Sequence, residues 1–270
     1  MSGAGAADFA AFERRGWAAR STTYGEGFGA MTAGAHPALL DAVGAGPGTR
    51  LLEVGCGTGR LAALALRRGA DVTATDAVPE MVEAAAAALS GARVERAALP
   101  GLPYPDGRFD AAVGAFVINH VPDPPAAAGD LHRVLAPGGR LALSCWDTLA
   151  ANRAQGLVFD AVRAAGGPPP AGLPGVAPFT RYASPDGLAA LLAGAGFTEV
   201  SVDRVRWTHR VDPADWWRHV LGGTVITAAL VEGRPPEEID AIRTEYLRLA
   251  APYAARGLPV AALVATGTRG

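Results

Sequence analysis

The segment of this sequence with the clearest chemical potential is a glycine-rich stretch, LLEVGCGTG, at residues 51–59. An apolar run leads directly into Gly55, Gly57 and Gly59, and a helical pattern begins immediately after them. Glycines at such a turn let the chain bend sharply and let backbone N–H groups approach a ligand closely. The N-terminus of the following helix favours an anionic group. We therefore predict a ligand-binding loop, with a tight turn that holds no ligand as the alternative.

A carboxylate follows this loop at the spacing that nucleotide-binding proteins use. Asp76 ends the next predicted strand, roughly 20 residues after Gly55, where an acid accepts hydrogen bonds from ribose hydroxyls. The alternative role is to cap the next helix. Pro79 as the first helical residue makes Val78 the cap, however, which leaves Asp76 free for a ligand. The loop and the acid together predict a cofactor that contains a nucleoside.

Two classes of cofactor fit a glycine loop with a ribose-binding acid. A nicotinamide dinucleotide requires G-x-G-x-x-G/A, which places a small residue at position 60. Here position 60 is Arg60, and the third glycine falls one residue earlier, at Gly59. The spacing therefore disfavours a nicotinamide-dependent oxidoreductase, although Arg60 could still meet a phosphate.

Composition excludes several other functions. All 24 basic residues of the 270 are arginine, so there is no P-loop lysine, no Schiff-base lysine and no Ser–Lys dyad. A net charge of −2 provides no basic face for nucleic acid. The apolar runs are far shorter than the ~20 residues that span a bilayer. We expect a cytoplasmic protein whose partners include neither nucleic acid nor membrane.

The cysteines and histidines offer little further chemistry. Cys56 and Cys145 are too few for a disulfide scaffold, and the five histidines show no metal-ligand spacing, so we expect no metal.

The elements that must position these residues can be read from the alternation of apolar and helical segments. Predicted strands cover 50–54, 71–75, 93–97, 109–116, 140–146, 199–208 and 259–266. The first five are nearly continuous apolar runs, as expected for parallel strands covered on both faces. Predicted helices cover about 59–68, 79–90, 125–135, 150–165 and 184–197, and 212–256 is largely helical. We place a turn at Pro137-Gly138-Gly139. The alternation predicts right-handed crossovers and a doubly wound sheet.

The motifs together resemble a known enzyme family. They are LLEVGCGTG at 51–59, Asp76 followed by PEM at 79–81, LPYPDGRFD at 102–110, NHVPD at 119–123 and LHRVLAPGGRL at 131–141. In their order and spacing they are similar to class I S-adenosylmethionine-dependent methyltransferases of the small-molecule type, such as those of ubiquinone and menaquinone biosynthesis and of natural-product tailoring. FERRGW at 12–17 with Tyr24 resembles the N-terminal helix that closes over the cofactor.

The resemblance implies a fold and a domain organisation. The expected fold class is α/β, a Rossmann-like, seven-stranded, doubly wound sheet that is mostly parallel with one reversed strand. Residues 1–36 would form an N-terminal cap region and residues 37–270 the methyltransferase domain. Lid insertions over the acceptor would lie at about 147–182 and 212–256. A homodimer is compatible with the sequence but cannot be inferred from it.

The resemblance also implies that S-adenosyl-L-methionine is the cofactor and S-adenosyl-L-homocysteine the product. Glu53 and the glycine loop would hold the methionine part, Asp76 the ribose, and Met81 the adenine face. The implied cofactor-binding residues are Tyr24, Glu53, Gly55, Cys56, Gly57, Gly59, Asp76, Ala77, Met81, Ala98, Leu99 and Ala115. Relatives often carry an acid where this sequence has Ala98, so the adenine edge would depend on backbone groups there.

Methyl transfer needs little chemistry from the protein beyond alignment and the exclusion of water. A base helps when the acceptor is a hydroxyl or a protonated amine. His120 follows the fourth predicted strand and is the candidate base. The alternative is that it packs or hydrogen-bonds the cofactor. We expect that His120→Ala lowers turnover without weakening cofactor binding, if it is the base.

Aromatic residues concentrate in the segments outside the predicted sheet. From these we take Trp146, Phe179, Arg181 and Trp216 as acceptor-pocket candidates, although lid helices packing on the sheet would explain most of the aromatics equally. An acidic acceptor would have to meet arginine or histidine, with Arg153, Arg181 and Arg206 as candidates.

Methyl transfer to O, N or C of a small molecule, a secondary metabolite or its precursor, is the function that this sequence favours. The alternatives are a methyltransferase-like fold that catalyses another reaction such as a cyclisation, a nicotinamide-dependent oxidoreductase, and a binding module without turnover. Tight binding of NAD with no binding of the adenosyl ligand would reject the interpretation as a methyltransferase.

Overall fold

The computed structural model describes residues 3–166, 168–170, 173 and 177–270. The first two residues of the expected cap region lie outside the described residues, and so do parts of the expected lid insertion at 147–182, namely 167, 171–172 and 174–176.

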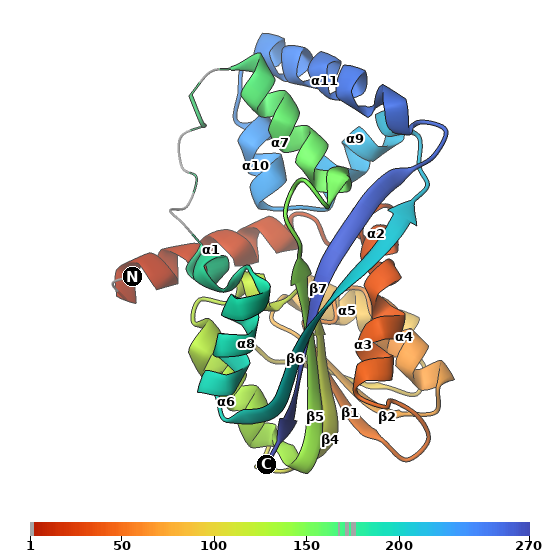
Figure 1. Ribbon diagram of the computed structural model, residues 1–270, viewed down its shortest axis with the longest axis vertical. Helices are drawn as coiled ribbons and strands as arrows, with labels where there is room; N and C mark the ends of the chain where they lie inside the picture. The colour runs from red at the N-terminus through yellow and green to blue at the C-terminus, as the bar shows by residue number, and fades with distance from the viewer. Residues whose placement is uncertain (1–2, 167, 171–172, 174–176) are drawn as a thin grey trace.

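A seven-stranded sheet runs through the molecule in the order β3-β2-β1-β4-β5-β7-β6 (Figure 1). The strands are β1 (Arg50–Val54), β2 (Asp71–Asp76), β3 (Arg93–Arg96), β4 (Phe109–Ala115), β5 (Leu135–Trp146), β6 (Phe197–His209) and β7 (Leu258–Arg269). Strands β1 to β5 pair in parallel, and β7 runs antiparallel to both of its neighbours. This is the Rossmann-like α/β fold with one reversed strand, which confirms the predicted fold class.

The predicted Pro-Gly-Gly turn is part of β5 as a bulge. Leu135 pairs with Phe109, and the next paired residues are Arg140 and Ala111, so the residues between loop out of the ladder. Gly138 has a φ of +75°, a conformation that glycine adopts without steric cost. The tripeptide therefore interrupts the strand rather than preceding it.

Helices cover both faces of the sheet (Figure 1). One face carries α3 (His36–Ala42), α4 (Arg60–Arg67) and α5 (Pro79–Ala88), which pack through one hydrophobic cluster that includes residues of β1, β2, β4 and β5. The other face carries α6 (Pro124–Val134) and α8 (Pro185–Gly194), which pack through a second cluster. The inner parallel strands are therefore buried on both faces, as the continuous apolar runs predict. The edge strand β3 is the exception, because its residues RVER are exposed or half-buried.

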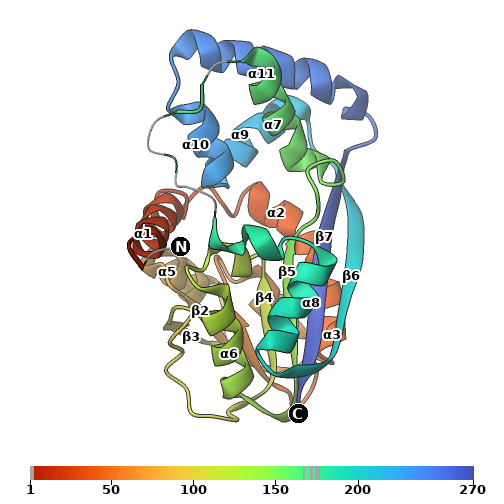
Figure 2. The same ribbon diagram turned by 60° about the vertical axis from the view of Figure 1, so that its left-hand side comes forward.

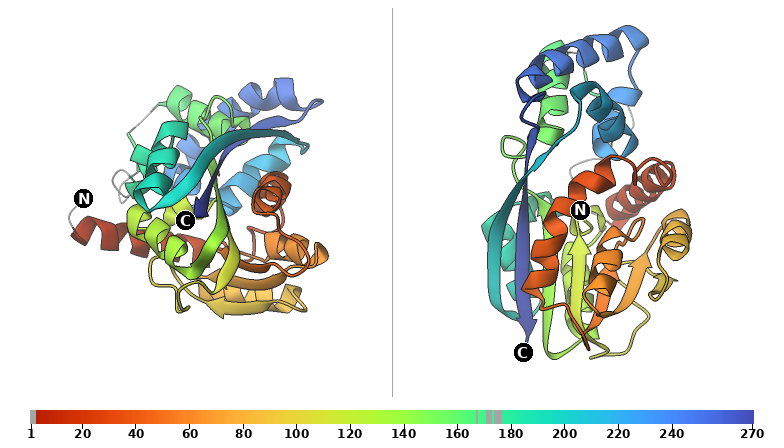
Figure 3. Two further views of the ribbon diagram at one scale, coloured as in Figure 1. Left: turned by 60° about the horizontal axis from the view of Figure 1, so that its bottom comes forward. Right: turned by 90° about the vertical axis from the view of Figure 1, so that its right-hand side faces the viewer.

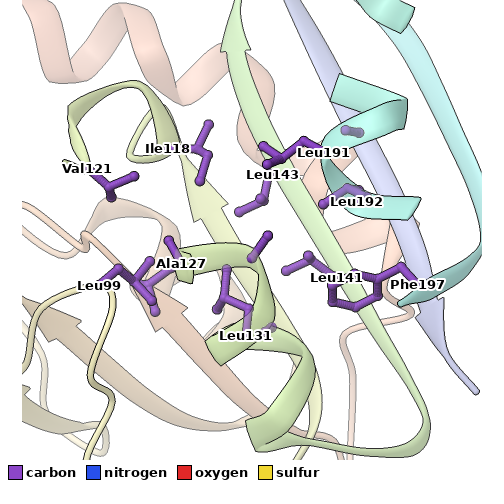
Figure 4. Close-up of a cluster of buried hydrophobic side chains, with 14 of the residues drawn as sticks. Leu99, Ile118, Val121, Ala127, Leu131, Leu141, Leu143, Leu191, Leu192 and Phe197 are labelled. Atoms are coloured by element: carbon purple, nitrogen blue, oxygen red, sulfur yellow. The ribbon is translucent and has the colours of Figure 1, made fainter. Parts of the chain in front are cut away.

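Figure 4 shows the second cluster in detail. Leu141 and Leu143 of β5 are fully buried between Leu131 of α6 and Leu192 of α8. Burying a leucine side chain contributes about 1.5–3 kcal/mol, so this layer anchors the carboxyl ends of β4 and β5.

Beyond the carboxyl ends of the parallel strands lies a helical lobe (Figure 1). It contains α7 (Arg153–Ala165), which follows β5, and α9 (Pro213–Gly222), α10 (Ile226–Glu232) and α11 (Pro236–Ala250), which follow β6. The long strands β6 and β7 extend from the sheet into this lobe (Figure 3). A separate apolar cluster, centred on Trp216 and Tyr246, holds the lobe together.

Two N-terminal helices lie between the sheet and the lobe. Helix α1 (Gly3–Ala18) passes beside α5 and below α10, and α2 (Phe28–Thr32) follows it (Figure 2). Four short 3-10 segments complete the described elements: η1 (Ala33–Ala35), η2 (Ile118–His120), η3 (Pro178–Tyr182) and η4 (Ala251–Tyr253). Helix α1 is therefore placed to cover whatever binds at the carboxyl ends of β1, β2 and β4.

Candidate active site

A cavity of about 750 Å³ opens at the carboxyl ends of the parallel strands. Its walls come from the ends of β1, β2 and β4, from the chain that follows β3, and from α1. Strand β1 lies between β2 and β4, so the chain order reverses at this point of the sheet. Ligands of open α/β sheets bind at such a reversal.

The glycine loop forms the floor of the cavity. Gly55 lies in the left-handed region with a φ of +66°, and a Cβ there would come within 2.7 Å of the Cβ of Val117. Only glycine fits this position without displacing Val117. Gly57 also lines the cavity, whereas Gly59 is the residue before α4 and faces Leu89 instead.

Arg60 has a structural role at this loop. Its guanidinium donates to the carbonyl of Gly25, 2.7 Å away, and so holds the N-terminal segment over the loop. This explains an arginine where a dinucleotide site has a small residue.

Asp76 lines the cavity and also organises the loop. One carboxylate oxygen accepts a hydrogen bond from the backbone N–H of Gly57, and the other accepts from that of Val78, each at 2.9 Å. Val78 is the residue that precedes α5, as expected, and no side chain caps this helix. Asp76 therefore contacts the backbone N–H of Val78 without accepting from α5 itself. Each oxygen keeps a further lone pair for a ligand.

Glu53 is the least satisfied polar group at the site. It is buried, and its Oε2 has no hydrogen-bond partner among the described residues. Burial raises the pKa of Glu53 to about 8, against a hydrogen bond from the backbone of Ala62 that lowers it. Glu53 lines a smaller void of about 20 Å³ that adjoins the large cavity through Gly55, Ala115 and Tyr24. A buried carboxylate oxygen without a partner is suited to a cationic group.

The opposite wall is aromatic. It is formed by Trp17, Tyr24, Phe28, Phe116 and Trp146. Phe116 and Trp146 stack with ring centroids 3.8 Å apart and planes at 22°, and Phe28 meets Trp146 edge-on at 5.8 Å. Phe116 is held at a φ of +58°, and its N–H donates to the hydroxyl of Ser144 at 3.1 Å. A wall of this kind favours a planar or apolar ligand.

His120 meets a carboxylate at the same cavity. Its Nδ1 is 2.8 Å from Oε2 of Glu13, which comes from α1. The indole N–H of Trp17 donates to the same oxygen at 3.0 Å. Glu13 is only 4% exposed, so this cluster is largely removed from water.

Comparison with known proteins identifies a domain within this chain. A protein-family model described as a methyltransferase domain matches residues 52–143, from β1 to β5. Within this stretch lie the glycine loop, Asp76 and His120. The chain therefore contains a methyltransferase domain over these residues.

Several curated proteins are similar to this methyltransferase domain. An uncharacterized protein of Mycobacterium tuberculosis is 38% identical over 114 residues, which cover 41% of this chain and 42% of that protein. The malonyl-[acyl-carrier protein] O-methyltransferase of Serratia marcescens is 36% identical over 111 residues, with the same two coverages. The chain thus spans less than half the length of these relatives.

Solved structures share the fold. The YcgJ protein from Bacillus has a TM-score of 0.57 at 17% identity, with 87% of this chain and 97% of that chain covered. The [4+2]-cyclase SpnF has a TM-score of 0.51 at 24% identity, with 87% and 79% covered. At these identities the likeness concerns the fold alone.

Most residues predicted from the methyltransferase motifs meet at the large cavity. Its wall includes Tyr24, Gly55, Gly57, Asp76, Ala77, Met81, Ala98, Leu99, Ala115, His120 and Trp146. Glu53 and Cys56 line the smaller void instead. The predicted residues thus line the large cavity or the smaller void. That they contact a cofactor stays a prediction.

Three of the acceptor-pocket candidates do not line the cavity. Phe179 is buried in the core cluster that α8 covers, and Arg181 lies over the ring of Tyr182 at 4.6 Å. Trp216 is fully buried in the helical lobe, where its indole N–H donates to the carbonyl of Ala154 at 2.7 Å. An apolar ring outside the sheet can serve a second hydrophobic core as well as a pocket, and the sequence does not distinguish the two.

Trp216 contacts the site only through another residue. It stacks on Phe28 with centroids 5.9 Å apart, and Phe28 lines the cavity. We expect Trp216→Ala to lower the free energy of unfolding by about 3–5 kcal/mol, because it leaves a large void in the lobe. Chemical denaturation measures this loss. Wild-type stability in Trp216→Ala would contradict the structural role.

The cavity wall also includes residues that the predicted site did not name individually, which are Glu13, Arg14, Trp17, Phe28, Arg96 and Phe116. The first three lie in FERRGW at 12–17, the segment expected to close over the cofactor. Arg14 and Arg96 are the arginines on the cavity wall, whereas Arg153 pairs with Asp160 at 2.6 Å. Arg206 lies exposed on β6, outside the cavity. The four-residue spacing of Glu13 and Trp17 was a signal that the two share a helix face.

Within the described part of the chain, no group of three or more His, Cys, Asp or Glu residues is arranged to hold a metal ion. No described helix combines the length and apolar character of a membrane span.

Proposed function

We propose that this protein transfers a methyl group from S-adenosylmethionine to a small, planar, largely apolar acceptor, such as a secondary metabolite or its precursor. One observation carries the proposal. A single cavity has the glycine loop and Asp76 at its floor and an aromatic wall with His120 opposite. Glu53, whose Oε2 has no hydrogen-bond partner among the described residues, lies in the void beside it. The first group of residues suits the cofactor and the second suits the acceptor.

The residues present fit this cofactor. Oε2 of Glu53, which lacks a partner, suits the amino group of the methionine part, and the N–H groups of the loop suit its carboxylate. Asp76 keeps lone pairs for ribose hydroxyls, and Met81 is a soft, buried side chain for the adenine face. When bound, the cofactor supplies a methyl group on a sulfonium, whose carbon–sulfur bond breaks with both electrons left on sulfur.

The protein's part in the reaction is alignment and the exclusion of water. The stacked pair Phe116 and Trp146 offers a flat surface for an aromatic acceptor, and residues of α1 line the same cavity. A small-molecule partner also agrees with the net charge of −2, which offers no general attraction to nucleic acid.

Calorimetry and a methyl-transfer assay test this proposal in sequence. We expect titration with S-adenosylhomocysteine to show binding and titration with NAD to show none. Incubation with S-adenosylmethionine labelled in its methyl group and a panel of hydroxylated aromatic compounds then transfers label to at least one of them. Tight binding of NAD without binding of the adenosyl ligand would overturn the proposal in favour of an oxidoreductase.

A second candidate function is a cyclisation with the cofactor bound but not consumed. The likeness of the fold to the [4+2]-cyclase SpnF favours it as the alternative. An apolar cavity that aligns a flexible chain could serve such a reaction without a base. Conversion of a polyene to an isomer of equal mass, with S-adenosylmethionine recovered unchanged, would identify this activity.

A further inference from the structure

We propose that Glu13 of helix α1 is a positioning residue for His120, and that the pair removes the proton of a hydroxyl-bearing acceptor. This rests on the proposed methyl transfer and names its acceptor class: a planar molecule with a weakly acidic hydroxyl, such as a phenol. It also gives α1 a part in the reaction beyond covering the cavity.

The contacts of Glu13 are those of a side chain held in one place. Its Oε2 meets Nδ1 of His120 at 2.8 Å and accepts from Nε1 of Trp17 at 3.0 Å. A carboxylate that is 4% exposed is costly to bury unless such donors surround it. The Trp17 ring also packs edge-on against His120, with centroids 5.0 Å apart and planes at 86°. Position and orientation of the imidazole are therefore set together by residues of α1.

These contacts determine which ring nitrogen of His120 carries the proton. An ionised carboxylate only accepts hydrogen bonds, so Nδ1 is the donor to Glu13 and Nε2 keeps its lone pair. The side-chain amide of Asn119 lies with Nδ2 at 2.9 Å from that Nε2 and donates to it. The lone pair that a base needs is thus present, and an acceptor hydroxyl takes the place of the Asn119 donor.

The proposed step is the transfer of a proton from the acceptor to His120. The proton of the acceptor hydroxyl moves to Nε2 of His120, and the electron pair of the O–H bond stays on the oxygen. That oxygen uses the pair for its bond to the methyl carbon. The resulting imidazolium is stabilised by the carboxylate of Glu13. A pair of this kind contributes about 10²- to 10⁴-fold to a reaction that needs a base.

A merely structural pair would behave differently. If Glu13 and His120 only anchor α1 to η2, their loss lowers stability but leaves the acceptor reaction unchanged in any molecule that stays folded. If Glu13 positions a base, its loss lowers kcat while KM and cofactor affinity stay close to wild type. The kcat of a folded Glu13 variant therefore distinguishes a structural role from a positioning role.

The first test needs no acceptor. Nitrogen-15 spectra of the histidine rings, recorded on the full chain with S-adenosylhomocysteine added, report which nitrogen of His120 carries hydrogen. We expect hydrogen on Nδ1 in the wild type and in Glu13→Gln, because the glutamine carbonyl still accepts, and a loss of this preference in Glu13→Ala. Arg15→Ala, an exposed change on the same helix, is the control and leaves the spectrum unchanged. An unaltered His120 signal in Glu13→Ala would overturn the proposal.

The second test uses a phenol that accepts label in the methyl-transfer assay. We expect kcat to fall about 100-fold in His120→Ala and about 10-fold or more in Glu13→Gln, with the affinity for S-adenosylhomocysteine within about threefold of wild type. Trp17→Phe keeps an aromatic ring but removes the N–H that donates to Glu13. We expect its kcat to lie between those of the wild type and Glu13→Gln. Wild-type kcat in a folded Glu13→Gln protein would overturn the proposal. If no compound accepts label, the proposed methyl transfer fails, while the ring spectra still decide on the pair.

Discussion

Glu53→Gln is expected to weaken the binding of S-adenosylhomocysteine by about 30- to 150-fold, the equivalent of one hydrogen bond to a charged group at about 2–3 kcal/mol. Oε2 of Glu53 is buried and has no hydrogen-bond partner among the described residues, and the ammonium of the ligand is the group that would donate to it. Glutamine keeps an oxygen that can accept from the backbone of Ala62, so the local fold is retained. Calorimetry measures the change. Glu83→Gln, an exposed glutamate on α5, is the control.

The same substitution is expected to stabilise the protein at alkaline pH. Burial raises the pKa of Glu53 from an ordinary 4.5 to about 8, so between these values the folded chain binds a proton that the unfolded chain has lost. The stability that this proton provides is complete below about pH 4.5 and is lost as the pH rises through about 8. Glutamine does not titrate. Between pH 5 and pH 8 the free energy of unfolding of the wild type therefore falls relative to that of Glu53→Gln.

Ligand binding to the wild type should then tighten as the pH rises from 6 towards 8. Glu53 must lose its proton before it can pair with the ammonium, and this cost shrinks as the pH approaches its pKa of about 8. Glu53→Gln removes this contribution to the pH dependence. Wild-type affinity in Glu53→Gln throughout this range would show that Glu53 does not hold the ligand.

Gly55→Ala should abolish measurable binding of S-adenosylhomocysteine and lower the free energy of unfolding by about 2–5 kcal/mol. The left-handed conformation at φ +66° costs any other residue about 1–2 kcal/mol, and the new Cβ is forced against the side chain of Val117. Relief of this contact has to move Val117 or the loop. Both line the cavity.

Gly44 offers a matched control for the backbone effect. Its φ is +64°, and a Cβ there meets nothing within 4 Å. Gly44→Ala should therefore lose only the conformational part, about 1 kcal/mol, and bind S-adenosylhomocysteine as the wild type does. Equal effects of the two substitutions on binding would mean that the close packing at Gly55 has no role in the ligand site.

The strands and the cofactor end of the cavity were predictable from local sequence. The inner parallel strands β1, β2, β4 and β5 are nearly continuous apolar runs because both of their faces are covered, and this pattern is visible without a structure. The edge strand β3 is partly exposed and carries three charged residues in four. Gly55, Gly57 and Asp76 follow directly on the inner strands. Since the carboxyl ends of parallel strands meet at one edge of the sheet, residues at those ends had to come together there.

The acceptor end was not predictable in the same way. The place of His120 after the fourth strand made it a candidate base, but its partner Glu13 lies 107 residues away in the sequence and by itself resembles any surface glutamate. Phe179 and Trp216 looked like pocket residues because they are aromatic and lie outside the sheet. Both are buried in hydrophobic clusters instead. Phe28, which packs in the same cluster as Trp216, lines the cavity wall.

By itself, the sequence determined the class of sheet, the turn that must be glycine and the acid that follows the second strand. These depend on the periodicity of neighbouring residues and on backbone conformation, which are local properties. Only the tertiary structure decided which side of α1 meets η2, which aromatic rings line the cavity, and that Glu53 lacks a partner. These depend on how helices from distant parts of the chain pack over one edge of the sheet, and such packing is set by the burial of whole surfaces rather than by any single motif.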